Sequence, residues 1–234
     1  MIFLLADILT QAREIFGNLP GFLEGFVQDH GLWVYGLLFA IIFAETGLVI
    51  MPFLPGDSLL FTVGALAAPG EGRPPILNLG WSLALLTFAA ILGDAVNYHA
   101  GHFIGPRVFK SKPGEGATRL ERMLNRRHLD RAHQFFEKYG GKAIILGRFV
   151  PIVRTFVPFV AGAGAMNYSR FALYNVSGAI LWVGVCVIAG WFFGNIPWVR
   201  KNFEAVVLGI IVVSLLPVAI ELWVERRKKP APAH

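Results

Sequence analysis

Four ionisable residues lie inside strongly apolar stretches of the chain. Glu45 and Asp57 flank the run TGLVIMPFLPG, and Arg148 and Arg154 lie within GRFVPIVRTFVPFVAGAGAM at 147–166. A carboxylate in a low-dielectric cavity can bind and release a proton near neutral pH. Arginine stays charged, and its planar guanidinium matches the oxygens of a phosphate. These residue types predict a site that binds an anionic group at the arginines and couples that binding to protons at the acids.

These charges have two interpretations. A carboxylate at bilayer depth costs about 2.5–3.5 kcal/mol on insertion scales, so ionisable residues in apolar segments usually serve function. The alternative is a set of static ion pairs that only holds segments together. We favour the functional interpretation, in which Glu45 and Asp57 pair with Arg148 and Arg154 when the site is empty. Protonation of the acids then frees the arginines.

The composition is that of a polytopic membrane protein. The 234 residues are 55% hydrophobic and only 15% charged, with a mean hydropathy of +0.58, which is too apolar for an ordinary soluble domain. The net charge of +6 comes from basic residues beside apolar segments, so we expect no nucleic-acid partner. The single cysteine, Cys186, excludes an internal disulfide, and His99 with His102 lacks a third ligand. We therefore expect no metal and no cofactor.

The chain divides into an amphipathic N-terminus, one membrane domain and a short tail. Residues 1–29 have apolar residues at helical spacing, and Pro20 and Gly21 are expected to end that helix. The membrane domain at 30–225 contains apolar spans predicted at 32–50, 81–104, 170–193 and 203–224. The tryptophans near the predicted span ends are expected to be interface anchors: Trp33, Trp81, Trp191, Trp198 and Trp223.

Two further apolar segments, 51–68 and 143–166, are interrupted by helix-breaking residues. The residues expected to shape them are Pro52, Pro55, Gly56, Pro151 and Pro158. Proline breaks a helix, and irregular backbone at bilayer depth is tolerated only where it lines a protein-walled or water-filled cavity. We therefore interpret both segments as re-entrant hairpins. The shared patterns Phe53-Leu54-Pro55 and Phe149-Val150-Pro151 indicate a weak internal repeat.

Charge asymmetry predicts the topology. The loop at 106–142 carries ten basic residues against four acidic ones, and the tail at 226–234 is also basic. The positive-inside rule places both in the cytoplasm, with Arg119–Tyr139 as an amphipathic surface helix. Two spans then separate loop from tail, so the hairpins enter from opposite sides and both termini are cytoplasmic. The predicted fold is all-α, with about four transmembrane helices and two opposed re-entrant hairpins in a weak inverted repeat that meet near the midplane.

Asp94 and Tyr98 form a second group of candidate residues. On a helix they share a stripe with Gly101 and Gly105, because steps of three and four residues lie on one face. This stripe is expected to face protein rather than lipid. An aspartate one turn from a tyrosine more often makes an interhelical hydrogen bond than a proton relay, so both are kept as secondary site residues.

Three motifs resemble the signatures of the DedA family, which is related to eukaryotic VTT-domain lipid scramblases. They are Glu45 with PFLPGD at 52–57, GDAVNYHAG at 93–101 and GRFVPIVRTFVPFVAG at 147–162. The resemblance covers about 30–195 and implies a bacterial inner-membrane protein that moves lipids. It implies undecaprenyl phosphate and phospholipids as candidate substrates and the proton gradient as the driver. The family's acidic pair matches Glu45 and Asp57, and its arginine pair matches Arg148 and Arg154.

Three functions are compatible with these observations, and we rank them as follows. The first is a lipid flippase or scramblase for an anionic phospholipid or undecaprenyl phosphate, coupled to protons and not an enzyme. The second is a proton-coupled antiporter for cations or drugs, which would use the acids without needing the arginines. The third is a membrane-embedded lipid phosphatase, which needs a nucleophile or metal that the motifs near the arginines do not supply. The expected partners are membrane lipids and protons, and the sequence leaves open whether copies of the chain form a homo-oligomer.

Overall fold

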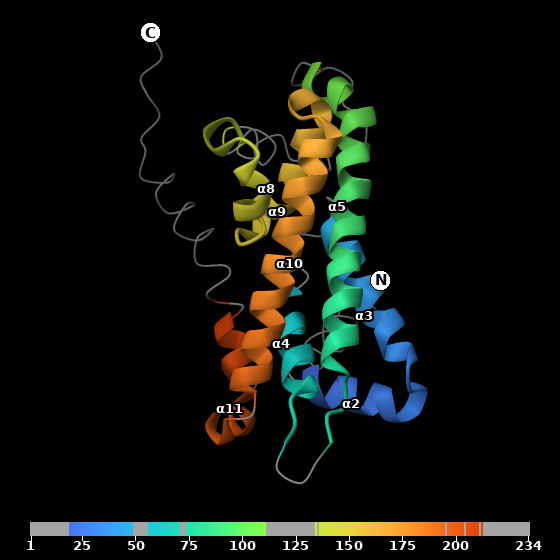
Figure 1. The fold of residues 1–234 in the computed structure, drawn as a ribbon, viewed down its shortest axis with the longest axis vertical. Coiled ribbons are helices and arrows are strands. Elements are labelled where there is room, and N and C mark those ends of the chain that lie inside the picture. Colours follow the sequence, from blue (N-terminus) through green and yellow to red (C-terminus); the bar gives the residue numbers. More distant parts are fainter. Residues whose placement is uncertain are drawn as a thin grey trace, which may run out of the picture.

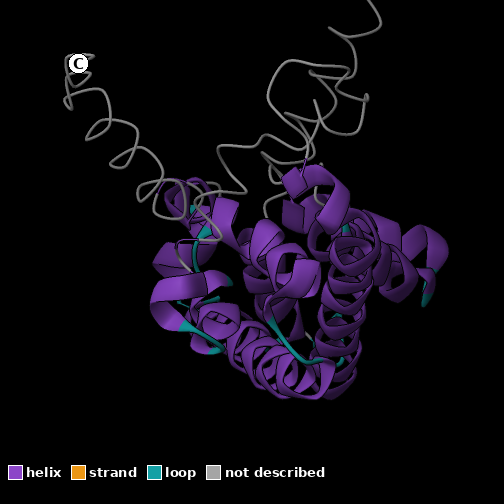
Figure 2. Ribbon diagram, turned by 90° about the horizontal axis from the view of Figure 1, so that it is seen from above, coloured by secondary structure: helices purple, strands orange, loops and turns teal. Residues whose placement is uncertain are grey.

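The computed structural model describes residues 19–48, 56–70, 74–110, 134, 136–194, 196–203, 205–210 and 212, and these residues form an all-helical bundle without a sheet (Figures 1 and 2). The helices are α2 (Leu19–His30), α3 (Trp33–Gly47), α4 (Gly56–Ala67), α5 (Leu79–Lys110), α8 (Lys142–Gly147), α9 (Pro151–Val160), the π-helical turn η1 (Ala161–Ala165), α10 (Tyr168–Phe193) and α11 (Pro197–Lys201). The predicted all-α class is confirmed.

Two long helices, α5 and α10, run antiparallel through the length of the molecule (Figure 1). They have 32 and 26 residues, which at 1.5 Å per residue is roughly 48 and 39 Å, more than the ~30 Å of a hydrocarbon core. Within the described residues, these two helices are long and apolar enough to cross a membrane, over Leu79–Gly105 and Tyr168–Phe193. They coincide with the spans predicted at 81–104 and 170–193. Large apolar side chains such as Phe103 and Phe192 are exposed on their outer faces, where lipid would lie.

The other predicted elements are matched in part. The span predicted at 32–50 is the 15-residue helix α3, which is shorter than the ~20 residues of a full crossing. The span predicted at 203–224 is described only at 203, 205–210 and 212, and the predicted surface helix Arg119–Tyr139 lies mostly outside the described residues. Helix α5 continues to Lys110, so the loop predicted from 106 begins later than expected.

The N-terminal prediction needs a correction. Residues 1–18 lie outside the described residues, but Pro20 and Gly21 lie in the first turn of α2. Proline is tolerated at the start of a helix because the N–H it lacks would have no intrahelical partner there. These two residues therefore begin a helix at the position where they were expected to end one.

The segments predicted as hairpins contribute short helices that pack on the long helices. Helix α4 packs mainly against α10, whereas α9 and η1 pack against α5. In Figure 1, α4 lies beside one half of the bundle and α8 and α9 lie beside the other half. Pro151 is in the first turn of α9, Pro158 lies inside it, and Gly164 has φ +132°, a conformation that favours glycine, at the end of η1. Pro52 and Pro55 lie outside the described residues.

The crossing of α4 with α10 has the same close contacts as the crossing of α9–η1 with α5. In both, the backbones approach so closely that a side chain at the facing glycines would collide with the neighbouring helix. The contacts are Gly64 on the Val187 carbonyl, Gly190 on the Phe61 carbonyl and Gly194 on Ala65 in the first crossing, and Gly162 on the Tyr98 carbonyl, Gly101 on the Phe159 carbonyl and Gly105 on Ala163 in the second. The sequence motifs Phe53-Leu54-Pro55 and Phe149-Val150-Pro151 are offset by two residues from this register. Contacts, rather than the proline motifs, define the correspondence.

Candidate functional site

The first charged cluster joins α3, α4 and α9 around Arg154. Glu45, near the end of α3, is fully buried, and its Oε1 accepts hydrogen bonds from Arg154 and, at 3.2 Å, from the backbone N–H of Gly56. The Oδ1 of Asp57 accepts a hydrogen bond from Arg154 Nη1 at 3.3 Å. Gly56 and Asp57 form the first turn of α4, where the helix dipole favours negative charge. One arginine is thus held by two carboxylates.

One oxygen of the Glu45 carboxylate lacks a hydrogen-bond donor within the described part of the chain. Its Oε2 is buried and has no hydrogen-bond partner among the described residues. A side chain at position 56 would collide with this carboxylate, so Gly56 makes room for it. A buried polar atom without a hydrogen-bond partner is costly, so the two oxygens of this carboxylate are held unequally.

The second cluster forms around Arg148, at the C-terminal end of α8. Its Nη2 donates to Asp94 Oδ2 at 2.5 Å and to Asn175 Oδ1 at 2.6 Å. The amide of Asn175 in turn donates to the Ile91 carbonyl at 3.0 Å. Both charged side chains are almost completely enclosed, with 3% and 4% of their surface exposed. This cluster joins α8 to both long helices.

The expectation that both arginines face Glu45 and Asp57 is therefore wrong for Arg148. The backbone between the two arginines is not one continuous helix, because Val150 is extended (φ −118°, ψ 106°) before α9 begins at Pro151. The two side chains consequently leave different helices and meet different acids. Asp94, expected as a secondary residue, is the ion-pair partner of Arg148.

Trp182 of α10 lies between the two clusters. The guanidinium carbons of Arg148 and Arg154 are 5.8 Å and 5.4 Å from the centre of its ring, within cation–π range. Its Nε1 donates to Asp57 Oδ1 at 2.7 Å, and only 1% of its surface is exposed. Trp182 and Asn175 were not among the site residues predicted from the sequence. The available signal was the position of Trp182 in the middle of the span predicted at 170–193, away from the span ends where tryptophan is common, and the polar Asn175 within the same apolar run.

The charged clusters lie at mid-depth between two apolar cores. Asp94 is at the midpoint of α5, and Trp182 is near the midpoint of α10. One core, on the α2–α4 side, includes Ile42 and Leu60, and the other includes Phe156 and Ile144. If α5 and α10 cross the bilayer, both clusters lie near its midplane.

Tyr98 and its neighbours hold η1 against α5. The Tyr98 hydroxyl donates to the Met166 carbonyl at 2.7 Å, and its ring stacks on Phe171 at 4.4 Å. Tyr98 is therefore bonded to a different element from the one that holds Asp94. The stripe of Asp94, Tyr98, Gly101 and Gly105 is buried against protein, as predicted.

Asn97 ties the two halves of the first cluster together. Its side-chain amide donates to the Thr46 carbonyl at 3.2 Å and to the Thr155 carbonyl at 2.7 Å. Each carbonyl belongs to the residue that follows a member of the cluster, Glu45 or Arg154. Asn97 thus fixes the spacing of α3 and α9 at the ion pair. In the part of the chain that is described, no group of three or more His, Cys, Asp or Glu side chains could hold a metal ion.

Two long apolar helices packed around buried ion pairs at mid-depth are the arrangement of a helical membrane protein with an intramembrane polar site. The VTT domain matches residues 54–192. Protein DedA of Escherichia coli K12 is 53% identical over 201 residues, covering 86% of this chain and 87% of that protein. The chain belongs to the VTT-domain (DedA) family.

More distant relatives are also bacterial membrane proteins. An uncharacterized membrane protein of Mycobacterium leprae is 44% identical, covering 78% of this chain and 77% of its own. Inner membrane protein YqjA of E. coli K12 is 36% identical, covering 80% of this chain and 78% of its own. These names support a location in a bacterial inner membrane. No solved structure matches the chain.

Proposed function

We propose that this protein moves an anionic, phosphate-bearing lipid across the bacterial inner membrane in a proton-coupled cycle, without altering the lipid chemically. The observation that carries the proposal is Arg154, a mid-depth cation whose guanidinium is held by two carboxylates. Placing ionisable residues inside a membrane costs free energy, and residues retained there usually serve a function. A phosphate can replace a carboxylate on arginine with the same bidentate geometry.

The exchange uses the groups around Arg154. In the empty site Glu45 and Asp57 neutralise Arg154. A proton that binds Glu45, on the oxygen that lacks a donor, and a second that binds Asp57 would convert both acids to neutral groups and leave the guanidinium available. The lipid phosphate then takes the vacated hydrogen bonds. Loss of the protons on the other side restores the carboxylates, which displace the phosphate.

Arg148 has a different role in this proposal from the one expected from the sequence. It is enclosed by Asp94 and Asn175 and touches the same indole ring as Arg154. We infer that it positions Trp182, which in turn holds Asp57 through its Nε1. Direct contact with the phosphate is assigned to Arg154 alone.

The architecture suited to this exchange is a pair of opposed re-entrant hairpins. The matched glycine crossings of α4 on α10 and of α9–η1 on α5 support a repeated unit. The position of α4 and α9 in opposite halves of the bundle (Figure 1) supports an inverted arrangement. In transporters with inverted repeats, broken segments meet at a midplane site that each side can reach in turn.

The test is a leaflet-resolved transport assay with purified protein in proteoliposomes, with and without a pH gradient. Undecaprenyl phosphate and an anionic phospholipid are compared as substrates. Glu45→Gln and Arg154→Ala are expected to lower transport about tenfold or more, whereas Asp29→Asn and Arg170→Ala, at exposed positions, should not change it. Headgroup analysis of the recovered lipid should find it unaltered.

Two results would contradict the proposal. Unchanged transport and unchanged pH dependence in both Glu45→Gln and Arg154→Ala would exclude the exchange at Arg154. Transport of a cation that is insensitive to Arg154→Ala but lost in Glu45→Gln would indicate the antiporter instead.

A further inference from the structure

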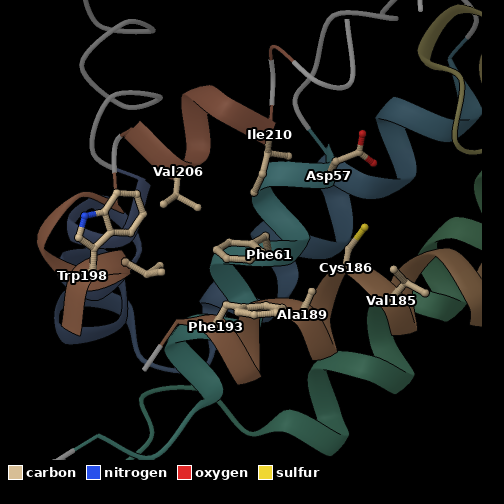
Figure 3. Close-up of a pocket in the computed structure, with 10 residues that line it drawn as sticks. Asp57, Phe61, Val185, Cys186, Ala189, Phe193, Trp198, Val206 and Ile210 are labelled. Carbon is tan, nitrogen blue, oxygen red and sulfur yellow. The ribbon is translucent and has the colours of Figure 1, made fainter. Parts of the chain in front are cut away.

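A cavity of about 460 Å³ opens beside the Arg154 cluster, between α4, α10, α11 and residues 205–210 (Figure 3). Asp57 is the one charged residue among the ten described residues that line it. Phe61, Ala189 and Phe193 form much of its wall, and Figure 3 shows Asp57 and Trp198 on opposite sides. The volume is within the 300–1,000 Å³ typical of ligand pockets. The cavity thus has an apolar body and one acidic end.

The surroundings of the cavity favour hydrocarbon as its content. An apolar cavity without two or more polar partners does not hold ordered water. Val185, on the same stretch of α10, is half exposed on the outer face of a helix that is apolar enough to cross a membrane. Lipid chains are the apolar molecules present at that depth.

Asp57 connects the cavity to Arg154. Its side chain is 22% exposed, whereas the side chains of Glu45 and Arg154 are 0% and 6% exposed. Asp57 is therefore the member of the cluster that the cavity reaches. A phosphate that takes the place of Asp57 on Arg154 would leave the rest of its lipid at the acidic end of the cavity.

We propose that the cavity holds one acyl chain of an anionic phospholipid whose phosphate lies at Arg154. The proposal rests on the proposed function in placing the headgroup there. The cavity volume suits a single unbranched chain better than the much longer, methyl-branched chain of a polyprenyl lipid. The cavity selects for chain shape, and Arg154 selects for charge.

The experiment uses a phosphatidylglycerol probe with a photoreactive diazirine near the end of one acyl chain. The probe is incorporated with the purified full chain in vesicles, irradiated, and the labelled residues are mapped by mass spectrometry. We expect labelling at the cavity residues of α10 and α11. Ala189→Phe, which fills the cavity, should lower this labelling about tenfold, equivalent to ~1.4 kcal/mol of affinity.

Matched variants separate cavity filling from general damage. Ala172→Phe introduces the same side chain on α10 roughly 25 Å away along the helix and should label like the parent protein. Val185→Trp narrows the cavity from a half-exposed position, where a larger side chain can extend outward, and should reduce labelling even if Ala189→Phe does not accumulate. A diacylglycerol probe with the same chain, and the anionic probe with Arg154→Ala, should both label weakly, because neither has the phosphate–arginine contact.

The following outcomes would overturn the proposal. Labelling spread over the outer faces of α5 and α10 and unchanged in Ala189→Phe and Val185→Trp would indicate bulk lipid contact. Equal labelling by diacylglycerol, or labelling by a polyprenyl phosphate probe alone, would exclude an anchored acyl chain. Cross-links to a second copy of the chain through the cavity residues would assign the cavity to an oligomer interface. Cavity labelling without lipid transport would contradict the proposed function but not the chain site.

Discussion

The two glycine crossings share their backbone contacts and differ in their charges. Gly64 of α4 packs against a backbone carbonyl of α10, and Gly162 of η1 packs against a backbone carbonyl of α5. The two glycines therefore occupy equivalent positions. In the same register, Asp57 corresponds to Thr155, and Gly56 corresponds to Arg154. Like charges at equivalent positions would repel each other at mid-depth, whereas an acid on one side and an arginine on the other attract. The two crossings therefore share a backbone scaffold, and the difference in their charged residues creates the site.

The two arginines differ in how accessible their acidic partners are. Arg148 is enclosed with Asp94 at 2.5 Å and is further held by Asn175. Arg154 shares a 3.3 Å contact with Asp57, the carboxylate that reaches the cavity. A closed pair is suited to hold helices together, whereas a pair with one accessible partner is suited to exchange.

Arg148→Ala is expected to have the largest effect, and the effect should be on folding. It leaves Asp94 buried without its cation, and breaking a buried pair costs about 3–5 kcal/mol. Thermal unfolding in detergent and the amount of protein in membranes measure the loss. The double variant Arg148→Met with Asp94→Leu should recover most of the stability, because apolar side chains of similar volume avoid the desolvation cost. If the Arg148→Ala protein were as stable as the parent, Arg148 would not have the structural role assigned to it here.

The corresponding change at the other arginine should spare the fold and affect transport. Glu45→Leu with Arg154→Met keeps the volume but removes the exchangeable pair. We expect transport to fall about 10- to 100-fold, because charge-assisted hydrogen bonds contribute ~1.5–3 kcal/mol. The leaflet-resolved assay measures it against the Arg148→Met, Asp94→Leu protein. Equal losses in two well-folded double variants would show that the arginines do not differ in role.

The likeness of the crossings is tested by Gly64→Ala and Gly162→Ala. Each added methyl meets a backbone carbonyl that cannot move aside like a flexible side chain. Overpacking of this kind costs about 1–3 kcal/mol, and the two losses in thermal unfolding should be similar. Gly184→Ala, where nothing lies within 4 Å, is the control and should be neutral or stabilising by about 0.5–1 kcal/mol. A large loss of stability in only one of the two variants would show that the two crossings are not equivalent.

Trp182→Phe should have the smallest effect. It keeps an aromatic ring near both arginines but removes the Nε1 donor to Asp57. Asp57 is partly exposed and retains Arg154, so we expect about 0.5–1.5 kcal/mol, or a two- to tenfold change in transport. Trp33→Phe, at a residue that is 77% exposed, serves as the control. An unchanged transport rate and pH profile would show that the indole N–H does not influence Asp57.

The amino-acid sequence by itself determined the features that depend on local information. The long apolar runs at 81–104 and 170–193 predicted α5 and α10, because length and composition alone decide which segments can cross a bilayer. Glu45, Asp57 and Arg154 could be selected as site residues because a charged residue in an apolar run is unusual, whichever residue it pairs with. The buried stripe of Asp94 and Tyr98 followed from helical periodicity.

Only the tertiary structure decided which charges meet. The partner of Arg148 depends on the extended break at Val150 and on the rotation of α8, α5 and α10 about their axes. Trp182 and Asn175 are far from the arginines in the sequence, and their direction is set by helix packing. The equivalence of the glycine crossings likewise follows only from their backbone contacts. The proline motifs would align the two segments two residues out of that register. Pairing across helices is a property of packing geometry, which no local pattern in one chain records.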